Sequence, residues 1–86
     1  MSNALFKFDV QLFAIAKELA QTDCLTIEVE LPITAKALMD AIGEASPPLR
    51  TWLPSCRLAV EQSFVPADHE LTRVTDVALI PPVSGG

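Results

Sequence analysis

Hydrophobic and polar residues alternate with a period of two along residues 5–13, 24–31 and 57–61. This period puts successive side chains on opposite faces of a strand, so each stretch predicts a strand with one buried face. In the first stretch the inward positions are Phe6, Phe8, Val10 and Leu12. Phe13 falls on the opposite, polar face. The pattern alone leaves open whether Phe13 packs under the following turn or is exposed on a docking surface.

Two shorter apolar stretches predict further strands. Residues 64–65 form a very short one that ends at Pro66, because proline has no backbone N–H to donate. Residues 62–63 are expected to form the turn before it. Residues 77–80 carry no charge, which is typical of a strand in the middle of a sheet. Leu71 lies in the intervening loop and is expected to reach into the core.

Two stretches have the spacing of helices. Residues 14–21 predict a short helix, with its apolar positions four residues apart on one face. Residues 35–45 predict the main helix, and Thr34 is suited to be its N-cap. The expected buried stripe of the main helix is Leu38, Ala41, Ile42 and Ala45. Trp52, which follows this helix, is expected in the core or at its edge.

These elements predict a two-layer α+β fold. A single main helix covers one face of the sheet, so the sheet is expected to be mixed and to contain about five strands. If the first and last strands are neighbours in its middle, they are parallel, and the right-handed crossover rule puts the helix on the sheet. This arrangement is the β-grasp. Residues 1–80 are assigned to this domain and residues 81–86 to an extended C-terminal tail.

Composition narrows the class of partner. The chain has 86 residues, of which 50% are hydrophobic, so it forms one small domain that cannot bury all of its apolar surface. Its net charge is −5 and its six basic residues are scattered, which argues against binding to nucleic acid. No apolar stretch approaches the ~18 residues needed to cross a membrane. The first residues also lack the basic region of a signal peptide.

Side chains suited to catalysis are few. Cys24 and Cys56 lack a Cys-x-x-Cys spacing, so we expect two free thiols and a reduced, cytoplasmic setting. His69 has no cysteine or second histidine near it in the sequence, which argues against a metal site. Because paired carboxylates, a Cys-His pair and a phosphate-binding loop are all lacking, the sequence argues against an enzyme that acts alone.

The last six residues have the most specific composition of the chain. They are Pro81, Pro82, Val83, Ser84, Gly85 and Gly86. The two prolines favour an extended backbone, and the two glycines remove all side-chain bulk from the end. Fully extended, such a tail reaches about 20 Å. It would let the terminal carboxylate enter a narrow site on another protein.

Four segments together resemble the ubiquitin-like sulfur carriers, and among these the small subunits of molybdopterin synthase. They are Phe13-Ala14-x-x-Lys17-Glu18-Leu19, Leu58-Ala59-Val60-Glu61-Gln62, Asp68-His69-x-Leu71 and the C-terminal Pro81-Pro82-Val83-Ser84-Gly85-Gly86. The tail is the specific signal, because it combines Gly-Gly at the chain end with Pro-Pro-Val before it. Glu61 departs from the family, which usually has Asn there, and residues 73–76 replace its usual Asp-Gly-Asp turn.

The resemblance implies a function for the tail. In that family an E1-like adenylyltransferase uses ATP and magnesium to activate the terminal glycine, here Gly86, and no cofactor is permanently bound. A sulfur donor protein then converts the carboxylate to a thiocarboxylate. The tail next enters the large catalytic subunit, which holds the pterin precursor, and sulfur transfer forms the molybdopterin dithiolene. The resemblance also implies a heterotetramer of two small and two large subunits.

The resemblance further implies a hydrophobic docking patch on the sheet face away from the helix. Its members here are Phe13, Phe64 and Ile80, which strand parity also puts on that face. Two alternatives stay open. The chain could be a sulfur carrier for another pathway, such as thiamin, tRNA or amino-acid thiolation, or a β-grasp interaction module whose Gly-Gly is never modified.

Overall fold

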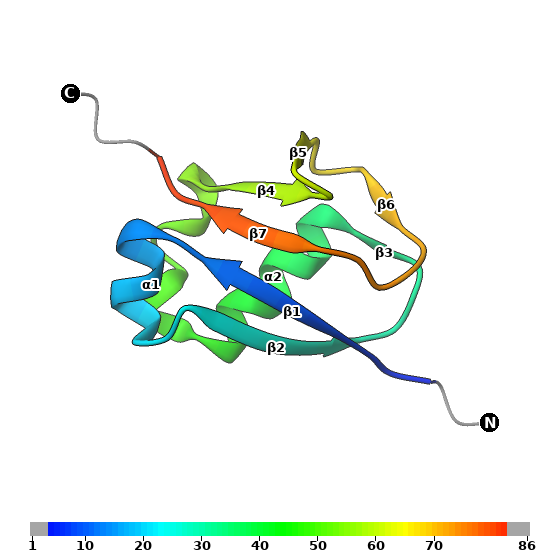
Figure 1. The fold of residues 1–86 in the computed structure, drawn as a ribbon, viewed down its shortest axis with the longest axis horizontal. Helices are drawn as coiled ribbons and strands as arrows, with labels where there is room; N and C mark the ends of the chain where they lie inside the picture. The colour runs from blue at the N-terminus through cyan, green and yellow to red at the C-terminus, as the bar shows by residue number, and fades with distance from the viewer. Residues whose placement is uncertain (1–3, 83–86) are drawn as a thin grey trace.

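The computed structural model describes residues 4–82 of the chain. Its main sheet contains β1 (Phe6–Leu12), β2 (Cys24–Val29), β4 (Arg57–Val60), β5 (Ser63–Val65) and β7 (Val77–Ile80). The spatial order is β2-β1-β7-β4-β5, so the first and last strands are neighbours near the centre (Figure 1). They pair in parallel, whereas the other pairs are antiparallel. The mixed five-stranded sheet of a β-grasp fold is therefore confirmed.

Two α-helices lie on one side of this sheet (Figure 1). They are α1 (Ala14–Ala20) and the main helix α2 (Ala35–Ala45). The hydroxyl Oγ1 of Thr34 accepts a hydrogen bond from the Ala37 N–H at 3.1 Å, so the predicted N-cap is confirmed. Two short 3₁₀ helices follow, η1 (Pro47–Leu49) and η2 (Leu53–Ser55). Trp52 lies between them and is 38% exposed, which places it at the edge of the core.

A second, two-stranded sheet closes one end of the fold. It pairs β3 (Ile33–Thr34) with β6 (Glu70–Leu71) in antiparallel register. The sequence predicted a loop at β6, but the expected burial of Leu71 is confirmed, since only 3% of this residue is exposed. The α2 N-terminus is tied to the same region, because the Ala35 N–H donates to the His69 carbonyl oxygen at 2.8 Å.

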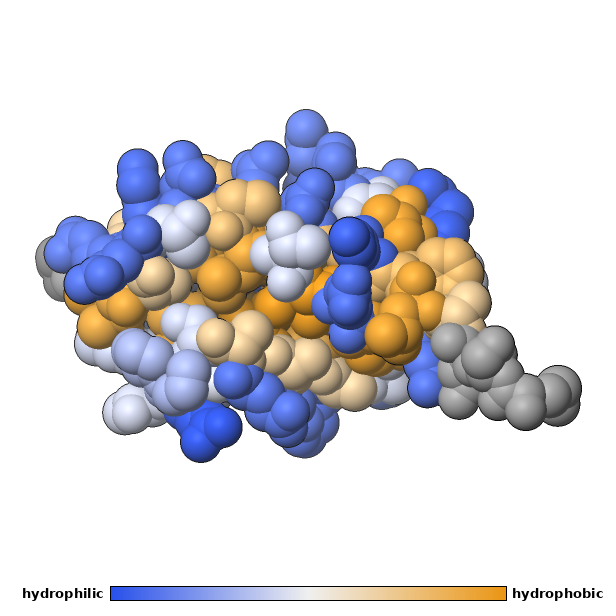
Figure 2. Space-filling model, turned by 90° about the horizontal axis from the view of Figure 1, so that it is seen from below, coloured by the Kyte–Doolittle hydropathy of each residue, from blue (hydrophilic) through white to orange (hydrophobic). Residues whose placement is uncertain are grey.

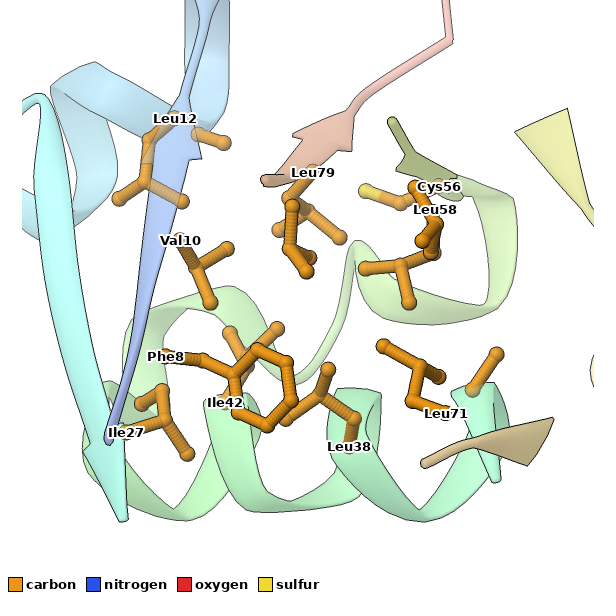
Figure 3. Packing of buried hydrophobic residues seen from close by; sticks show 14 of the residues in the cluster. Phe8, Val10, Leu12, Ile27, Leu38, Ile42, Cys56, Leu58, Leu71 and Leu79 are labelled. Atoms are coloured by element: carbon orange, nitrogen blue, oxygen red, sulfur yellow. The ribbon is translucent and has the colours of Figure 1, made fainter. Parts of the chain in front are cut away.

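The core lies between the sheet and α2 (Figure 3). Alternate residues of the strands point inward onto the apolar stripe of the helix, as the two periodicities require. The largest fully buried side chains are Phe8, Val10, Leu12, Leu38, Ile42, Leu49, Leu58 and Leu79. Burial of one face of the sheet leaves the other, which we call the outer face, without any helix over it (Figure 1).

Two predicted core positions are wrong. Phe6 was placed inward but is 41% exposed. Its strand runs past the end of β7, which pairs with β1 only from Val10 onward, so Phe6 has no central strand beside it. Ala45 was placed in the buried stripe of α2 but is exposed, and Gly43 is buried instead. A Cβ added at Gly43 would lie 2.7 Å from Cδ1 of Leu53, so close packing explains a glycine inside this helix.

Figure 2 views the molecule from the β2 edge and shows apolar side chains gathered in a band between polar margins. At the end where β1 begins, the apolar surface includes Leu5, Phe6 and Val74, each more than 40% exposed. Within residues 4–82, no helix is long and apolar enough to span a membrane.

Candidate functional site

Strand register brings one row of residues together across the outer face. Gln11 of β1 is paired with Cys24 on one side and with Ala78 of β7 on the other. Ala78 is paired with Ala59 of β4, which is paired in turn with Phe64 of β5. The middle of this row therefore consists of two alanines. Their small side chains leave a shallow floor that larger residues on either side can enclose.

The next row contains the other two residues of the predicted patch. Leu12 pairs with Leu79, so Phe13 and Ile80 follow on neighbouring strands, and Ile80 is paired with Arg57. An open groove of about 430 Å³ lies over both rows. Its lining residues are Gln11, Phe13, Ala59, Gln62, Phe64, Asp76, Val77, Ala78 and Ile80. The structure thus brings together the three residues that the sequence predicted to form one patch.

The backbone conformation at the end of β1 leaves the Phe13 side chain exposed to solvent. Phe13 is extended, with φ −130° and ψ 155°, and is 45% exposed. The next residue, Ala14, has φ 53°, which turns the chain so that α1 starts on the helical side of the sheet. The Phe13 carbonyl oxygen accepts a hydrogen bond from the Ala16 N–H at 3.1 Å. The question left open by the pattern is answered, because the turn does not cover this ring.

A tight turn places Phe64. The connection between β4 and β5 consists of Glu61 and Gln62, whose φ angles are 52° and 68°. Two consecutive positive φ values are the signature of the type I′ hairpin turn, whose twist matches that of the flanking strands. The turn was predicted one residue later, at residues 62–63, so that prediction is wrong. With the observed register, Phe64 shares the outer face with Ala59 and is 51% exposed.

Polar and charged side chains border the apolar groove. Oγ1 of Thr26 donates to Oδ1 of Asp9 at 3.1 Å on the β1–β2 side. On the turn side, Nη2 of Arg73 lies 3.0 Å from Oε2 of Glu61. Asp76 lies at the groove itself. An apolar centre with a polar margin is the usual anatomy of a protein–protein interface.

The described part of the tail begins beside this groove. Pro81 directly follows Ile80 and is buried, whereas Pro82 is exposed. Pro81, the first residue of the predicted extended tail, therefore packs with the domain. The remaining predicted tail residues, Val83, Ser84, Gly85 and Gly86, lie outside the described residues.

The cysteines and the histidine do not form a reactive cluster in the described part of the chain. Cys24 is exposed and Cys56 is buried, and neither is in a disulfide. Burial raises the pKa of the Cys56 thiol, which favours its neutral form. Among residues 4–82, no group of three or more His, Cys, Asp or Glu side chains could hold a metal ion.

Arg57 is a residue of this face that the sequence interpretation did not single out. Its guanidinium carbon lies 4.1 Å from the centre of the Phe64 ring. The alternation of residues along β4 does indicate that Arg57 lies on the same face as Ala59. The pairing with Phe64 could not be read from it, because the contact depends on the register of the hairpin.

The model of the ThiS family matches residues 10–86. This chain belongs to the ThiS family. It is 37% identical over 79 residues to the molybdopterin synthase sulfur carrier subunit of Escherichia coli (strain K12), a match covering 90% of this chain and 96% of that protein. It is 33% identical over 89 residues to the protein of the same name from Dictyostelium discoideum, with both chains fully covered.

Solved structures show the same fold as this ThiS family member. SAMP1 from Haloferax volcanii superposes with a TM-score of 0.84 at 22% identity, covering 94% of this chain and 100% of that one. The Caldiarchaeum subterraneum ubiquitin gives 0.64 at 16% identity, covering 96% and 100%. A chain from the complex of subunits 1 and 2 of molybdopterin-converting factor from Helicobacter pylori gives 0.61 at 21% identity, covering 94% and 100%. The fold is thus the ubiquitin-like β-grasp.

Proposed function

We propose that this protein is the sulfur carrier subunit of a molybdopterin synthase and that the carboxylate of Gly86 carries the sulfur. The observation that supports this most strongly is the 37% identity to a molybdopterin synthase sulfur carrier subunit over 96% of that protein's length. The family match extends to residue 86 and so includes the Gly-Gly end.

The proposed chemistry begins with activation of the tail. A carboxylate is a poor electrophile, because an oxide ion is not a viable leaving group. An E1-like adenylyltransferase, using ATP and magnesium, joins the Gly86 carboxylate to AMP and releases pyrophosphate. Sulfide released by a donor protein then attacks the carbonyl carbon, and the carbon–oxygen bond to AMP breaks as the new carbon–sulfur bond forms, which leaves the thiocarboxylate and free AMP. The carrier supplies no acid or base, only an unhindered carbon at its end.

The groove on the outer face is the proposed contact for the large subunit. It is open and apolar and lies beside the end of β7, so a partner seated on it is positioned next to the start of the tail. Phe13 and Phe64 are aromatic anchors of the kind that dominate binding at interfaces. The Helicobacter pylori structure is a complex of subunits 1 and 2 of molybdopterin-converting factor, which supports a large subunit as the partner here. The complex is proposed to be a heterotetramer.

The test is mass spectrometry of the intact protein after co-expression with the adenylyltransferase and the sulfur donor. Wild type and the surface control Ser55→Ala should gain the mass difference between one sulfur and one oxygen atom. Gly86→Ala should gain much less, because the added methyl group crowds the reacting carbon. A wild-type protein that never gains this mass would refute the proposal and favour an unmodified interaction module.

A second measurement separates molybdopterin synthesis from other sulfur-transfer pathways. The purified thiocarboxylate form is mixed with the large subunit and the pterin precursor, and dithiolene formation is followed. Product formation supports the proposal. A stable thiocarboxylate that yields no dithiolene and does not bind the large subunit would instead assign the carrier to thiamin, tRNA or amino-acid thiolation.

A further inference from the structure

The basic side chains of the protein differ in what they contact. Among the described residues, ion pairs join Lys7 to Glu28 at 3.7 Å, Lys36 to Asp40 at 3.1 Å and Arg73 to Glu61 at 3.0 Å. Nε of Arg50 donates to the Gly43 carbonyl oxygen at 3.2 Å. Four of the six cations are therefore engaged with oxygen acceptors of their own chain.

Arg57 contacts a ring instead of an oxygen. Its guanidinium carbon lies 4.1 Å from the centre of the Phe64 ring, well within the range of a cation–π contact. Within residues 4–82 the Arg57 side chain forms no ion pair and no hydrogen bond. A guanidinium group has five N–H donors, and its flat face can lie on a ring while its edges stay free to donate. Arg57 is thus held in place with its donors available.

The position of Arg57 in the sheet is equally specific. It is paired with Ile80, the last residue of β7, and it precedes Ala59 on the outer side of β4. Ile80 and Phe64 both line the groove. Arg57 is therefore placed at the corner of the outer face nearest the start of the tail, with its guanidinium against Phe64, whereas Asp9 and Asp76 lie toward the other end of the same face.

We propose that Arg57 binds an Asp or Glu side chain of the large subunit at this corner and so fixes the orientation in which the two subunits dock. This inference rests on the proposed function. Guanidinium and carboxylate groups form paired, charge-assisted hydrogen bonds of defined geometry. Because the Phe64 ring already restricts the guanidinium, less side-chain freedom is lost on binding.

Apolar burial alone would hold the partner on the groove without fixing its orientation. The distribution of charged side chains along the groove can fix that orientation. Arg57 borders the tail end of the groove and Asp76 lines its other end, so complementary charge on the partner favours one of the two opposite orientations. Orientation matters here because the tail has to point into the partner. Arg57 is therefore a specificity-determining residue of the docking face and not a catalytic one.

The first test measures equilibrium binding of the full-length protein to the large subunit by calorimetry at several salt concentrations. Arg57→Gln should weaken binding about tenfold or more, because a hydrogen bond to a charged group is lost. It should also reduce the salt dependence of the dissociation constant. The matched control is Lys36→Gln, which removes the same charge from an exposed ion pair on α2. Arg57→Lys should fall between wild type and Arg57→Gln, since lysine keeps the charge but not the planar pair of donors.

The second test identifies the partner group chemically. In the Arg57→Lys variant the introduced amine can be joined to a nearby carboxylate by a carbodiimide, with loss of water and formation of an amide bond. Peptide mapping of the complex should find the amide between position 57 and an Asp or Glu of the large subunit. The link between Lys36 and Asp40, whose charged atoms are 3.1 Å apart, is the internal control for the reagent.

Three results would overturn the inference. Arg57→Gln could bind as tightly as Lys36→Gln, the internal control could react while position 57 does not, or position 57 could link only to a second copy of the protein. In each case the proposed function would stand as long as wild type binds the large subunit and forms the thiocarboxylate. Failure of wild type to bind at all would instead overturn both.

Discussion

Replacing Phe64 with aspartate should separate binding from folding. Phe64 is 51% exposed and contacts Arg57. Complete burial of a large apolar side chain contributes about 1.5–3 kcal/mol, so half-burial contributes about 1 kcal/mol. The cation–π contact adds about 0.5–1 kcal/mol. The new carboxylate can pair with Arg57, which recovers part of that loss. Phe64→Asp should therefore lower the free energy of unfolding by about 1–2 kcal/mol, out of a typical 5–15 kcal/mol for a small domain.

The same substitution should reduce binding much more than it reduces stability. It removes an aromatic anchor and puts a carboxylate into a contact that is apolar at its centre. Loss of one anchoring aromatic residue costs about 2 kcal/mol or more, which corresponds to at least a thirtyfold increase in the dissociation constant. In the Arg57→Gln background the effect of Phe64→Asp on binding should be smaller, since the two side chains act as one contact.

Urea unfolding, followed by the fluorescence of the single Trp52 and by circular dichroism, measures the stability. Calorimetry with the large subunit measures the binding. Phe8→Ala is the control for a core aromatic residue, because Phe8 is fully buried and its truncation should cost about 3–5 kcal/mol. A loss of stability in Phe64→Asp as large as in Phe8→Ala would show that Phe64 belongs to the core. Unchanged binding by a folded Phe64→Asp protein would show that the outer face does not dock.

Three further predictions test the fold. Thr34→Ala should lower the free energy of unfolding by about 1 kcal/mol in urea unfolding, because the Ala37 N–H loses its cap, whereas Thr34→Ser should keep most of it. Burial raises the pKa of the Cys56 thiol in the folded protein, so between pH 9.0 and that raised pKa the unfolded chain loses the proton while the folded chain keeps it, and stability falls with rising pH over this window. That decline should disappear in Cys56→Ala but persist in Cys24→Ala, and a decline unchanged in both would contradict the assignment. Gln62→Gly should raise the free energy of unfolding by about 0.5 kcal/mol, since glycine tolerates φ 68°, and a lowered free energy of unfolding would contradict the turn type.

The five strands of the main sheet and its central pair could be predicted because two simple patterns agree, whereas the short strands β3 and β6 were missed. The inward residues of β1, such as Phe8 and Val10, alternate strictly, and the uncharged β7 fits only where both edges are covered by neighbouring strands. Once these two strands are adjacent and parallel, the rule for crossover connections leaves few arrangements. The N-cap could also be predicted, since a threonine directly before an amphipathic helix commonly accepts a hydrogen bond from a backbone N–H of the first turn.

Burial at the ends of elements could not be predicted from periodicity. Phe6 and Ala45 are in register with buried residues, but their neighbours in space stop short of them. Whether a residue is covered there depends on the length of other strands and helices, which alternation along one segment does not encode. The same limit applies to Arg57, whose contact with Phe64 depends on a turn that lies one residue earlier than expected.

The turn between β4 and β5 has a residue, Glu61, that its backbone conformation does not favour. Type I′ positions favour Asn and Gly, because these residues tolerate positive φ, and the resemblance leads one to expect Asn at position 61. Glu61 instead adopts φ 52° and forms an exposed ion pair with Arg73 at 3.0 Å. Such a pair contributes at most about 1 kcal/mol, which offsets only part of the ~1–2 kcal/mol cost of the left-handed backbone conformation. The charge is thus kept beside the groove at some cost in stability.

The buried Pro81 links the docking face to the reach of the tail. Because Pro81 packs with the domain, the part of the chain free to enter a partner begins at Pro82, and five residues to Gly86 span at most about 17 Å when fully extended. Under the proposed function, a reactive site in the partner must therefore lie within that distance of the groove. A partner docked in the reverse orientation would place its site on the wrong side of the groove, out of reach. Contacts that orient the partner, such as Arg57, should consequently affect sulfur transfer even though they never touch the reacting carbon.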